Sequence, residues 1–134
     1  MDMHNTTKFS RGISPFSRTD DTAIVSEIID FTGFEENEFV ILTGSLADAG
    51  ATFTTLFEHG NAANLSDAVA VPDEDLIGTE AQATFTQAND DSVFKLGYRG
   101  IKKYGRVTIT PAGNAAAALI GAVWAQRGAR KTPV

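Results

Sequence analysis

Apolar and polar residues alternate along several short stretches of this chain of 134 residues. The run NEFVILTGSLA (37–47) places Phe39 and Ile41 on one side of an extended chain, and ATFTTLFEHG (51–60) follows the turn residues DAG (48–50). A repeat of two residues is that of a β-strand that buries one face, and Thr, Phe and Val suit a pleated, half-buried surface. Since the link is short, the two runs are predicted to form a β-hairpin.

Further strands are predicted on both sides of this pair. The segment TAIVSEIIDF (22–31) is rich in β-branched residues, and DDSVFKLGY (90–98) and KKYGRVTIT (102–110) follow later in the chain. In the last of these, Val107 and Ile109 are predicted to face inward because they are two residues apart. The residues that alternate with them are predicted to face the other way: Tyr104, Arg106, Thr108 and Thr110.

The segment NAAAALIGAVWAQR (114–127) has two interpretations. Its alanine content and Asn114 at a possible N-cap favour a helix. The alternation of Ile120 and Trp124 with Gly121, and the strand-like neighbours in sequence, favour a buried closing strand. We predict a strand over 114–126, and at least six strands in all, because many short strands separated by turns are typical of a sandwich or a barrel.

The two ends of the chain are predicted to lie outside this domain. Residues 1–21 are polar and lack a period, so they are interpreted as an N-terminal arm; residues 22–126 form the domain, and 127–134 a short basic tail. Three apolar residues in the arm indicate that it docks on its own domain or on a neighbour: Phe9, Ile13 and Phe16. We expect residues 1–18 to become ordered only on that neighbour.

Charge and composition narrow the classes of function. The net charge is −6, but residues 1–18 carry +2, residues 127–134 carry +3, and the stretch between them carries −11. An acidic chain of this kind lacks the basic footprint of a general nucleic-acid binder. Cysteine is absent, which excludes disulfides, thiolate metal sites and thiol catalysis. No apolar run approaches the length of a membrane span, and no signal-like core is present, so we expect assembly inside a cell.

One basic segment interrupts the acidic stretch. Residues 19–94 contain no Lys or Arg, and then Lys95, Arg99, Lys102, Lys103 and Arg106 arrive together with Tyr98 and Tyr104. A solvated edge strand, a nucleic-acid contact that uses tyrosine stacking and a protein interface all fit this pattern. The acidic background disfavours nucleic acid, and we predict a protein–protein contact.

Catalytic and metal-binding patterns are absent from the sequence. His4 and His59 have no partner at metal or triad spacing, and His59 is interpreted as an exposed turn residue. The acidic run at 73–75 lacks the alternate ligands and the glycine of a calcium loop, so it is interpreted as a solvated loop. No nucleophile, phosphate-binding or dinucleotide motif occurs. We therefore expect no enzymatic activity, no metal and no cofactor.

Three segments together resemble a family of small proteins from tailed bacteriophages. These are VPDEDLIG (71–78), FKLGYRGIKKYGRVTIT (94–110) and AAALIGAVWA (116–125). The resemblance covers roughly residues 22–126 and implies the β-sandwich cement, or decoration, proteins of phage heads. Lys103 stands where the family usually has Arg, which would weaken a bidentate pair, and Gly105 stands where a bulky strand residue is common.

The pattern and the resemblance together predict an all-β, jelly-roll-like sandwich that acts as a structural virion protein. It would bind the outside of a tailed-phage capsid, with the major capsid protein as partner, and form a homo-dimer. A head-to-tail connector or tail protein, and a carbohydrate-binding β-sandwich module, are the alternatives. The predicted interface residues are Phe9, Ile13, Phe16, Tyr98, Arg99, Lys102, Lys103, Tyr104 and Arg106.

Overall fold

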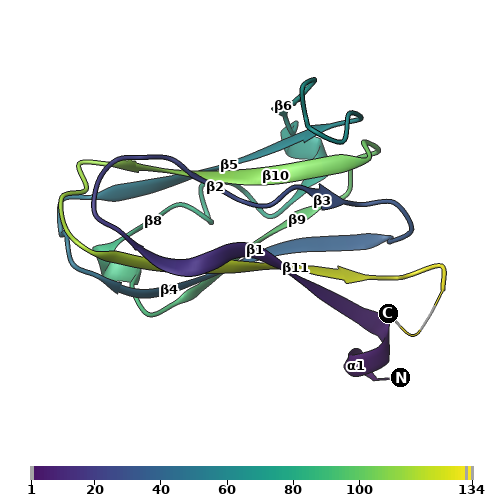
Figure 1. The fold of residues 1–134 in the computed structure, drawn as a ribbon, viewed down its shortest axis with the longest axis horizontal. Coiled ribbons are helices and arrows are strands. Elements are labelled where there is room, and N and C mark those ends of the chain that lie inside the picture. The colour runs from purple at the N-terminus through teal and green to yellow at the C-terminus, as the bar shows by residue number, and fades with distance from the viewer. Residues whose placement is uncertain (1, 132, 134) are drawn as a thin grey trace.

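The computed structural model describes residues 2–131 and 133, in which two antiparallel β-sheets pack face to face (Figure 1). Sheet A contains, in order, β1 (Thr7–Arg18), β11 (Ala118–Arg127), β4 (Glu36–Leu46), β9 (Val93–Tyr98) and β7 (Leu76–Ile77). Sheet B contains β2 (Ile24–Val25), β10 (Tyr104–Ala112), β5 (Thr52–Gly60) and β6 (Val69–Ala70), with β3 (Ile29–Asp30) on β10 and β8 (Phe85–Thr86) on β5.

The strands alternate between the two sheets in the manner of a jelly roll. The chain runs from β1 in sheet A to β2 and β3 in sheet B, returns to sheet A in β4, and crosses again to β5. The last three strands, β9, β10 and β11, cross twice more. The predicted all-β sandwich with at least six strands is thus confirmed by eleven strands in the described residues.

Helical structure is confined to short turns. The described residues contain α1 (Met3–Thr6) and the 3-10 turns η1 (Asp73–Asp75) and η2 (Gln87–Asn89). Asp2 caps α1 by accepting a hydrogen bond from the Asn5 backbone N–H at 2.7 Å. Within the described residues, no helix has the length and hydrophobicity that crossing a membrane requires.

The predicted hairpin between 37–47 and 51–60 is wrong. These runs are strands β4 and β5, but β4 pairs with β11 and β9 in sheet A, whereas β5 pairs with β10 in sheet B. Each strand has an apolar side that faces the core, and the short link lets these two sides face each other across the core between the sheets. The link is held by Asp48, which accepts hydrogen bonds from the backbone N–H groups of Gly50 and Ala115, both at 2.9 Å.

The closing strand predicted over 114–126 is confirmed from residue 118 onward as β11, whereas 114–117 form a turn. Its inward side carries Trp124, which is fully buried, and Gln126, which donates to the Asp30 carbonyl at 2.9 Å. Asn114 is not a helix cap. It is buried in the turn before β11, where its amide donates to the Arg18 carbonyl at 3.0 Å.

The predicted arm differs most from the structure. Thr7–Arg18 form β1, which pairs with β11 along the edge of sheet A and buries Ile13 to 6% exposure. The pairing register shifts at two points, between Arg11 and Ile13 and between Ile13 and Phe16. Such bulges insert extra residues and break the period of two, which is why the sequence shows no strand pattern here. Of the predicted tail, Arg127 belongs to β11, and residues 132 and 134 lie outside the described residues.

Aromatic side chains fill the middle of the sandwich. Trp124 packs edge-on against Phe39 with ring centroids 4.6 Å apart, and Phe31 stacks on Tyr98 at 4.2 Å. Val107 and Ile109 of β10 face this core, as predicted. The two sheets therefore leave only their outer faces and their ends for contact with other molecules.

Candidate functional site

The outer face of sheet B is mostly polar. Thr108 and Thr110 of β10 lie beside Leu56 and Thr54 of β5. At one end of this face Arg106 pairs with Glu58 on the neighbouring strand, with Nε and Oε1 3.2 Å apart. Cross-strand threonine and opposite-charge pairs are typical of a sheet face that contacts water.

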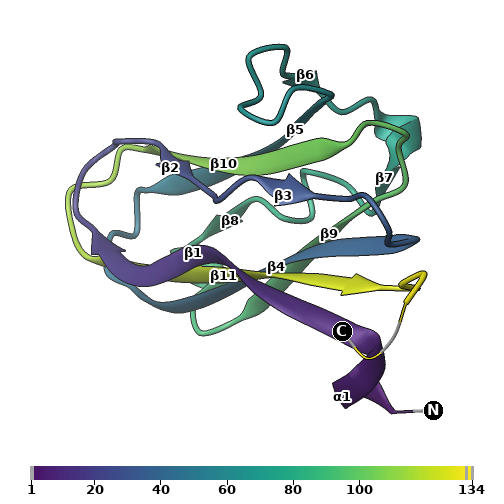
Figure 2. The ribbon, with the colours of Figure 1, turned by 45° about the vertical axis from the view of Figure 1, so that its right-hand side comes forward.

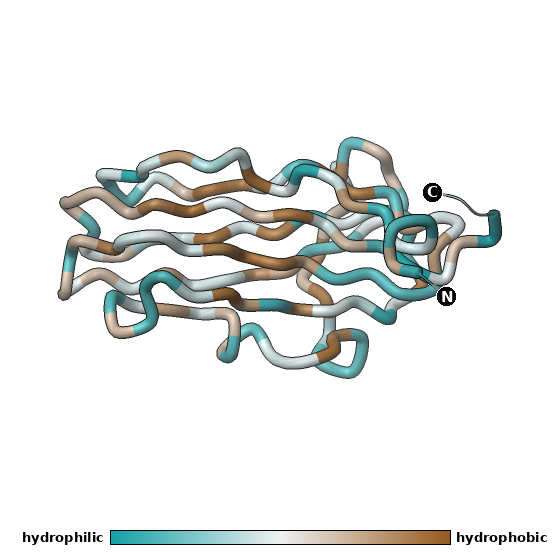
Figure 3. Tube along the Cα trace, turned by 90° about the horizontal axis from the view of Figure 1, so that it is seen from below, coloured by the Kyte–Doolittle hydropathy of each residue, from teal (hydrophilic) through white to brown (hydrophobic). Residues whose placement is uncertain are grey.

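The outer face of sheet A is apolar instead. Leu42 and Val93 are 60% and 62% exposed there, and Leu119 and Val123 are more than 40% exposed. Seen from the side of sheet A, hydrophobic stretches of neighbouring strands lie side by side (Figure 3). We call this surface the apolar face, and it consists of Phe9, Val40, Leu42, Val93, Leu119 and Val123.

Strand register makes the apolar face continuous. Val123 of β11 pairs with Val40 of β4, and Leu42 of β4 pairs with Val93 of β9. Side chains that pair across strands, or that are two residues apart, are in contact on one face. The aliphatic side chains therefore form one patch across three strands, which is unusual for a surface that faces only water.

A shallow hollow of about 1000 Å³ lies on the apolar face. Gly44 and Gly121 form part of its lining. A Cβ at Gly44 would lie 3.0 Å from Leu119, and a Cβ at Gly121 would lie 3.3 Å from Pro15. The side chains of Leu119 and Pro15 thus fold over glycine backbone at its border. The hollow offers a recessed apolar seat for a side chain of another molecule.

Charged side chains border the apolar face. Arg11 pairs with Glu27 at 3.0 Å on the β1 side, with both side chains largely exposed. Lys95 is exposed on the β9 side, and Glu38 lies half-buried on β4. Burial raises the pKa of the Glu38 carboxyl, and the charge of Lys95 opposes this rise. The border is therefore polar while the centre is aliphatic, the arrangement found in protein interfaces.

The three apolar residues of the predicted arm have separate positions. Phe9 is 58% exposed and lines the hollow, so its predicted surface position agrees with the structure. Phe16 is half-buried at the rim, with the Arg18 guanidinium 4.8 Å from its ring centroid. Ile13 is a core residue, so its predicted interface role is wrong.

Two predictions in the region of the basic segment also need correction. Tyr98 is only 2% exposed because it points inward from β9, where its hydroxyl accepts from the Lys102 N–H at 3.1 Å. His59 is 4% exposed rather than a surface turn residue, and its Nδ1 lies 2.8 Å from the Tyr98 hydroxyl. Burial lowers the pKa of His59, and the negative charge of Asp75 opposes this shift. The contact between His59 and Tyr98 links β5 of sheet B to β9 of sheet A.

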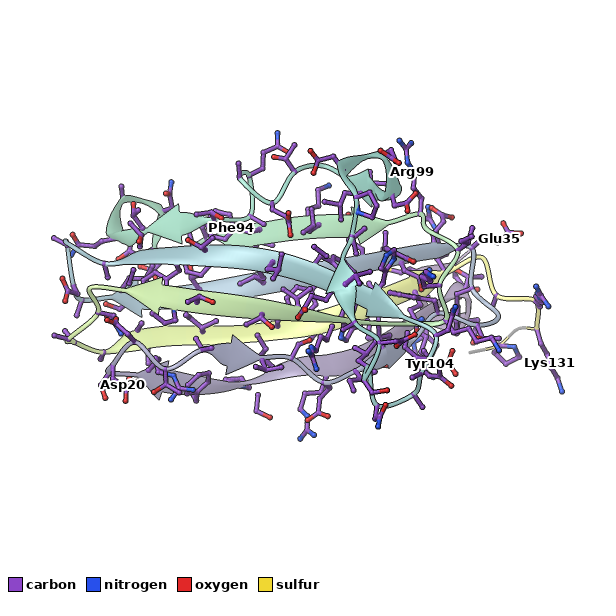
Figure 4. All side chains as sticks on the ribbon, turned by 90° about the horizontal axis from the view of Figure 1, so that it is seen from above. Asp20, Glu35, Phe94, Arg99, Tyr104 and Lys131 are labelled. Atoms are coloured by element: carbon purple, nitrogen blue, oxygen red, sulfur yellow. The ribbon has the colours of Figure 1, made fainter. Side chains whose placement is uncertain are left out.

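The remaining basic-segment residues divide between two surfaces. Arg99, Lys102 and Lys103 lie in the loop between β9 and β10, at the end of the sandwich that also carries Glu35 and Lys131 (Figure 4). Tyr104 and Arg106 are half-buried on the outer face of sheet B. The structure therefore brings Arg99, Lys102 and Lys103 together in one loop, and Tyr104 lies at the same end of the sandwich, where β10 begins (Figure 4).

Apart from Phe9, the residues of the apolar face were not predicted from the sequence to lie at an interface. In β4 the core residues Phe39 and Ile41 alternate with Val40 and Leu42, so both sides of the strand are apolar. A strand that is apolar on both sides has either two buried faces or one exposed apolar face. The apolar residues on both sides of β4 could therefore have indicated an exposed apolar face from the sequence. Among the described residues, no group of three or more His, Asp or Glu side chains is arranged to hold a metal ion.

No family model and no curated protein matches this chain. Among solved structures, the xylan-binding module CBM15 is 14% identical with a TM-score of 0.49, over 98% of this chain and 96% of that one. A CBM22-1–GH10 xylanase of Clostridium thermocellum is 8% identical with a TM-score of 0.45, and the match covers 96% of this chain but 27% of the xylanase. A protein of the Bacillus endospore appendages is 12% identical with a TM-score of 0.40, over 92% and 88% of the two chains. At these identities the similarity concerns the β-sandwich fold alone.

Proposed function

We propose that this protein is a structural virion protein that docks its apolar face on the outside of a tailed-phage capsid and bridges the capsid subunits. The observation that carries the proposal is the continuous aliphatic surface of sheet A, with Leu42 and Val93 about three-fifths exposed. The resemblance of three chain segments to phage decoration proteins supports the choice of partner. Many copies on a symmetric shell would add weak contacts through multivalency.

The composition of the apolar face favours a protein surface over a sugar. Sugar rings stack on flat, exposed aromatic side chains, whereas the apolar face has one aromatic residue, Phe9 on its edge strand, and its centre is formed by Val40, Leu42 and Val123. Trp124 and Tyr98 are buried in the core. Aliphatic side chains bind through shape and loss of water, which suits the packed surface of another protein. A carbohydrate-binding module therefore remains the less supported alternative.

A binding measurement on phage heads tests this proposal. Heads assembled without this protein are titrated with the wild-type chain, with Leu42→Asp and with Thr54→Asp. Thr54 is the matched control, because it is an exposed strand residue on the outer face of sheet B. Leu42→Asp places a charge in the docking surface and should weaken binding at least tenfold, since burying a leucine contributes about 1.5–3 kcal/mol. Thr54→Asp should bind as the wild type does.

Two results would contradict the proposal. Equal binding of Leu42→Asp and the wild type would remove the apolar face from the contact. Binding to purified tails or connectors in place of heads would favour the alternative of a connector or tail protein. The thermal melting curve of Leu42→Asp serves as the folding control. It should match that of the wild type, because Leu42 is exposed and its change should leave the core intact.

A further inference from the structure

A second surface lies at the end of the sandwich, away from the apolar face. A hollow of about 290 Å³ opens there between the loop after β3 (31–35) and the loop after β9 (99–103). We call it the end hollow. Its lining includes four cationic residues, Arg99, Lys102, Lys103 and Arg130, and one acidic residue, Glu35.

The cations of the end hollow are available for a partner. The ion pairs of the described residues involve Arg11, Arg106 and Arg127, and none includes a cation of the end hollow. Asn37, which is 7% exposed, also lines the hollow. Its Oδ1 accepts from Gln126 at 2.9 Å, while its amide nitrogen donates to none of the described residues. The hydrogen bond from Gln126 thus holds Asn37 in the wall of the end hollow.

An acidic turn lies directly beside the end hollow. The residues of η1 precede β7, and in Figure 2 this turn lies at the same end of the molecule as the loop from β9 into β10. Arg99 belongs to both features, because its backbone N–H donates to the Asp75 carbonyl at 2.9 Å and its Nε donates to the Glu74 carbonyl at 2.8 Å. These bonds use backbone oxygens. The exposed carboxylates of Asp73 and Glu74 accept no hydrogen bond from the described residues.

We propose that two copies of this chain dock end to end, each placing its acidic turn at the end hollow of the other. A two-fold contact requires that a patch and its complement lie side by side on one surface, and Arg99 connects the two here. The carboxylates of Asp73 and Glu74 would meet Lys103 and Arg130 of the second copy. Ile101, which is 95% exposed at the tip of the same loop, would lose water in this contact.

This contact goes beyond the proposed function and is separate from it. The apolar face of sheet A stays open in the pair, so the same molecule can bind a capsid and a second copy. Exposed ion pairs are weak and are screened by salt. We therefore expect a dimer that forms in the micromolar range at low salt and dissociates as salt is added.

Sedimentation velocity of the intact protein, without heads, tests the end-to-end contact. One variant is Lys103→Glu/Arg130→Glu, and the other is Asp73→Lys/Glu74→Lys. These side chains are exposed and make no hydrogen bond with other described side chains, so both variants should fold. Each variant alone should be monomeric, because like charges then meet across the contact. An equimolar mixture should form a heterodimer, because both contacts are again complementary.

Controls separate this contact from the apolar face. Lys95→Glu makes a charge change of the same kind on the outer face of sheet A and should leave the wild-type dimer intact. Three results would each overturn the proposal: a monomeric wild type at high micromolar concentration and low salt, double variants that still dimerise alone, and a mixture that stays monomeric. If Leu42→Asp abolishes the dimer while the double variants retain it, the apolar face is the dimer contact and the end-to-end contact is wrong.

Discussion

The core around Gly105 leaves no room for a side chain. A Cβ at this position would lie 2.5 Å from Cζ of Phe31 and 3.1 Å from Cε1 of Phe57, closer than side chains pack. The glycine is therefore coupled to Phe31, whose ring fills the space and stacks on Tyr98.

Gly105→Ala is predicted to destabilise the fold. The added methyl group forces Phe31 from its stacked position, and overpacking of this kind costs about 1–3 kcal/mol. The free energy of unfolding in urea measures the effect. Gly50→Ala is the control, because the nearest atom to its Cβ would be the Asp48 carboxylate at 3.5 Å. Equal stability of the two variants would contradict the packing at Gly105.

Burial of His59 makes the free energy of unfolding depend on pH. Burial lowers its pKa below the ordinary value of 6.5, so just below that value the unfolded chain binds a proton that the folded chain does not. The contribution of His59 to the free energy of unfolding therefore falls as the pH drops through 6.5. His59→Gln removes the titration, so the slope between about pH 7 and pH 5.5 should flatten. An unchanged slope in chemical denaturation would rule out His59 as the source.

At the scale of elements, the strands with a clean period of two could be predicted from sequence. Strands β4, β5 and β10 appear where the alternation placed them, and β11 appears where the preferred of two interpretations placed it. Sheet membership could not be predicted, because a strand with one apolar side fits a hairpin and a sandwich equally well. β1 was missed because bulges shift its register twice. Burial of Tyr98 was missed for a different reason: Lys95 and Tyr98 are three residues apart and therefore point to opposite sides of β9.

The role of β1 leads to a prediction opposite to that for a loose arm. Deleting residues 2–18 removes Ile13 from the core and exposes the edge of β11, a liability for aggregation. Loss of Ile13 burial alone costs about 1.5–3 kcal/mol, so the melting temperature should drop sharply. Deleting residues 2–6 removes α1, which has no buried residues, and should change it little. If the 2–18 deletion has the same melting temperature as the intact protein, β1 does not stabilise the domain and behaves as a loose arm.

The whole molecule presents three different surfaces. Sheet B offers threonines and an ion pair to the solvent, sheet A offers aliphatic side chains, and one end carries adjacent basic and acidic groups. The sequence indicated the basic segment but not the apolar face, because exposure of the second side of β4 depends on which layer covers it. Under the two proposals made above, sheet A would dock on the capsid, the end would contact a second copy, and sheet B would face water.

The proposed docking is tested most directly by a cryo-EM reconstruction of tailed-phage heads to which this protein has been added. We expect density for the sandwich on the outside of the capsid, with Leu42, Val93 and Val123 against the shell and the threonines of sheet B facing outward. Density in which sheet B faces the shell, or a capsid that lacks the sandwich altogether, would contradict the proposal that the apolar face is the docking surface.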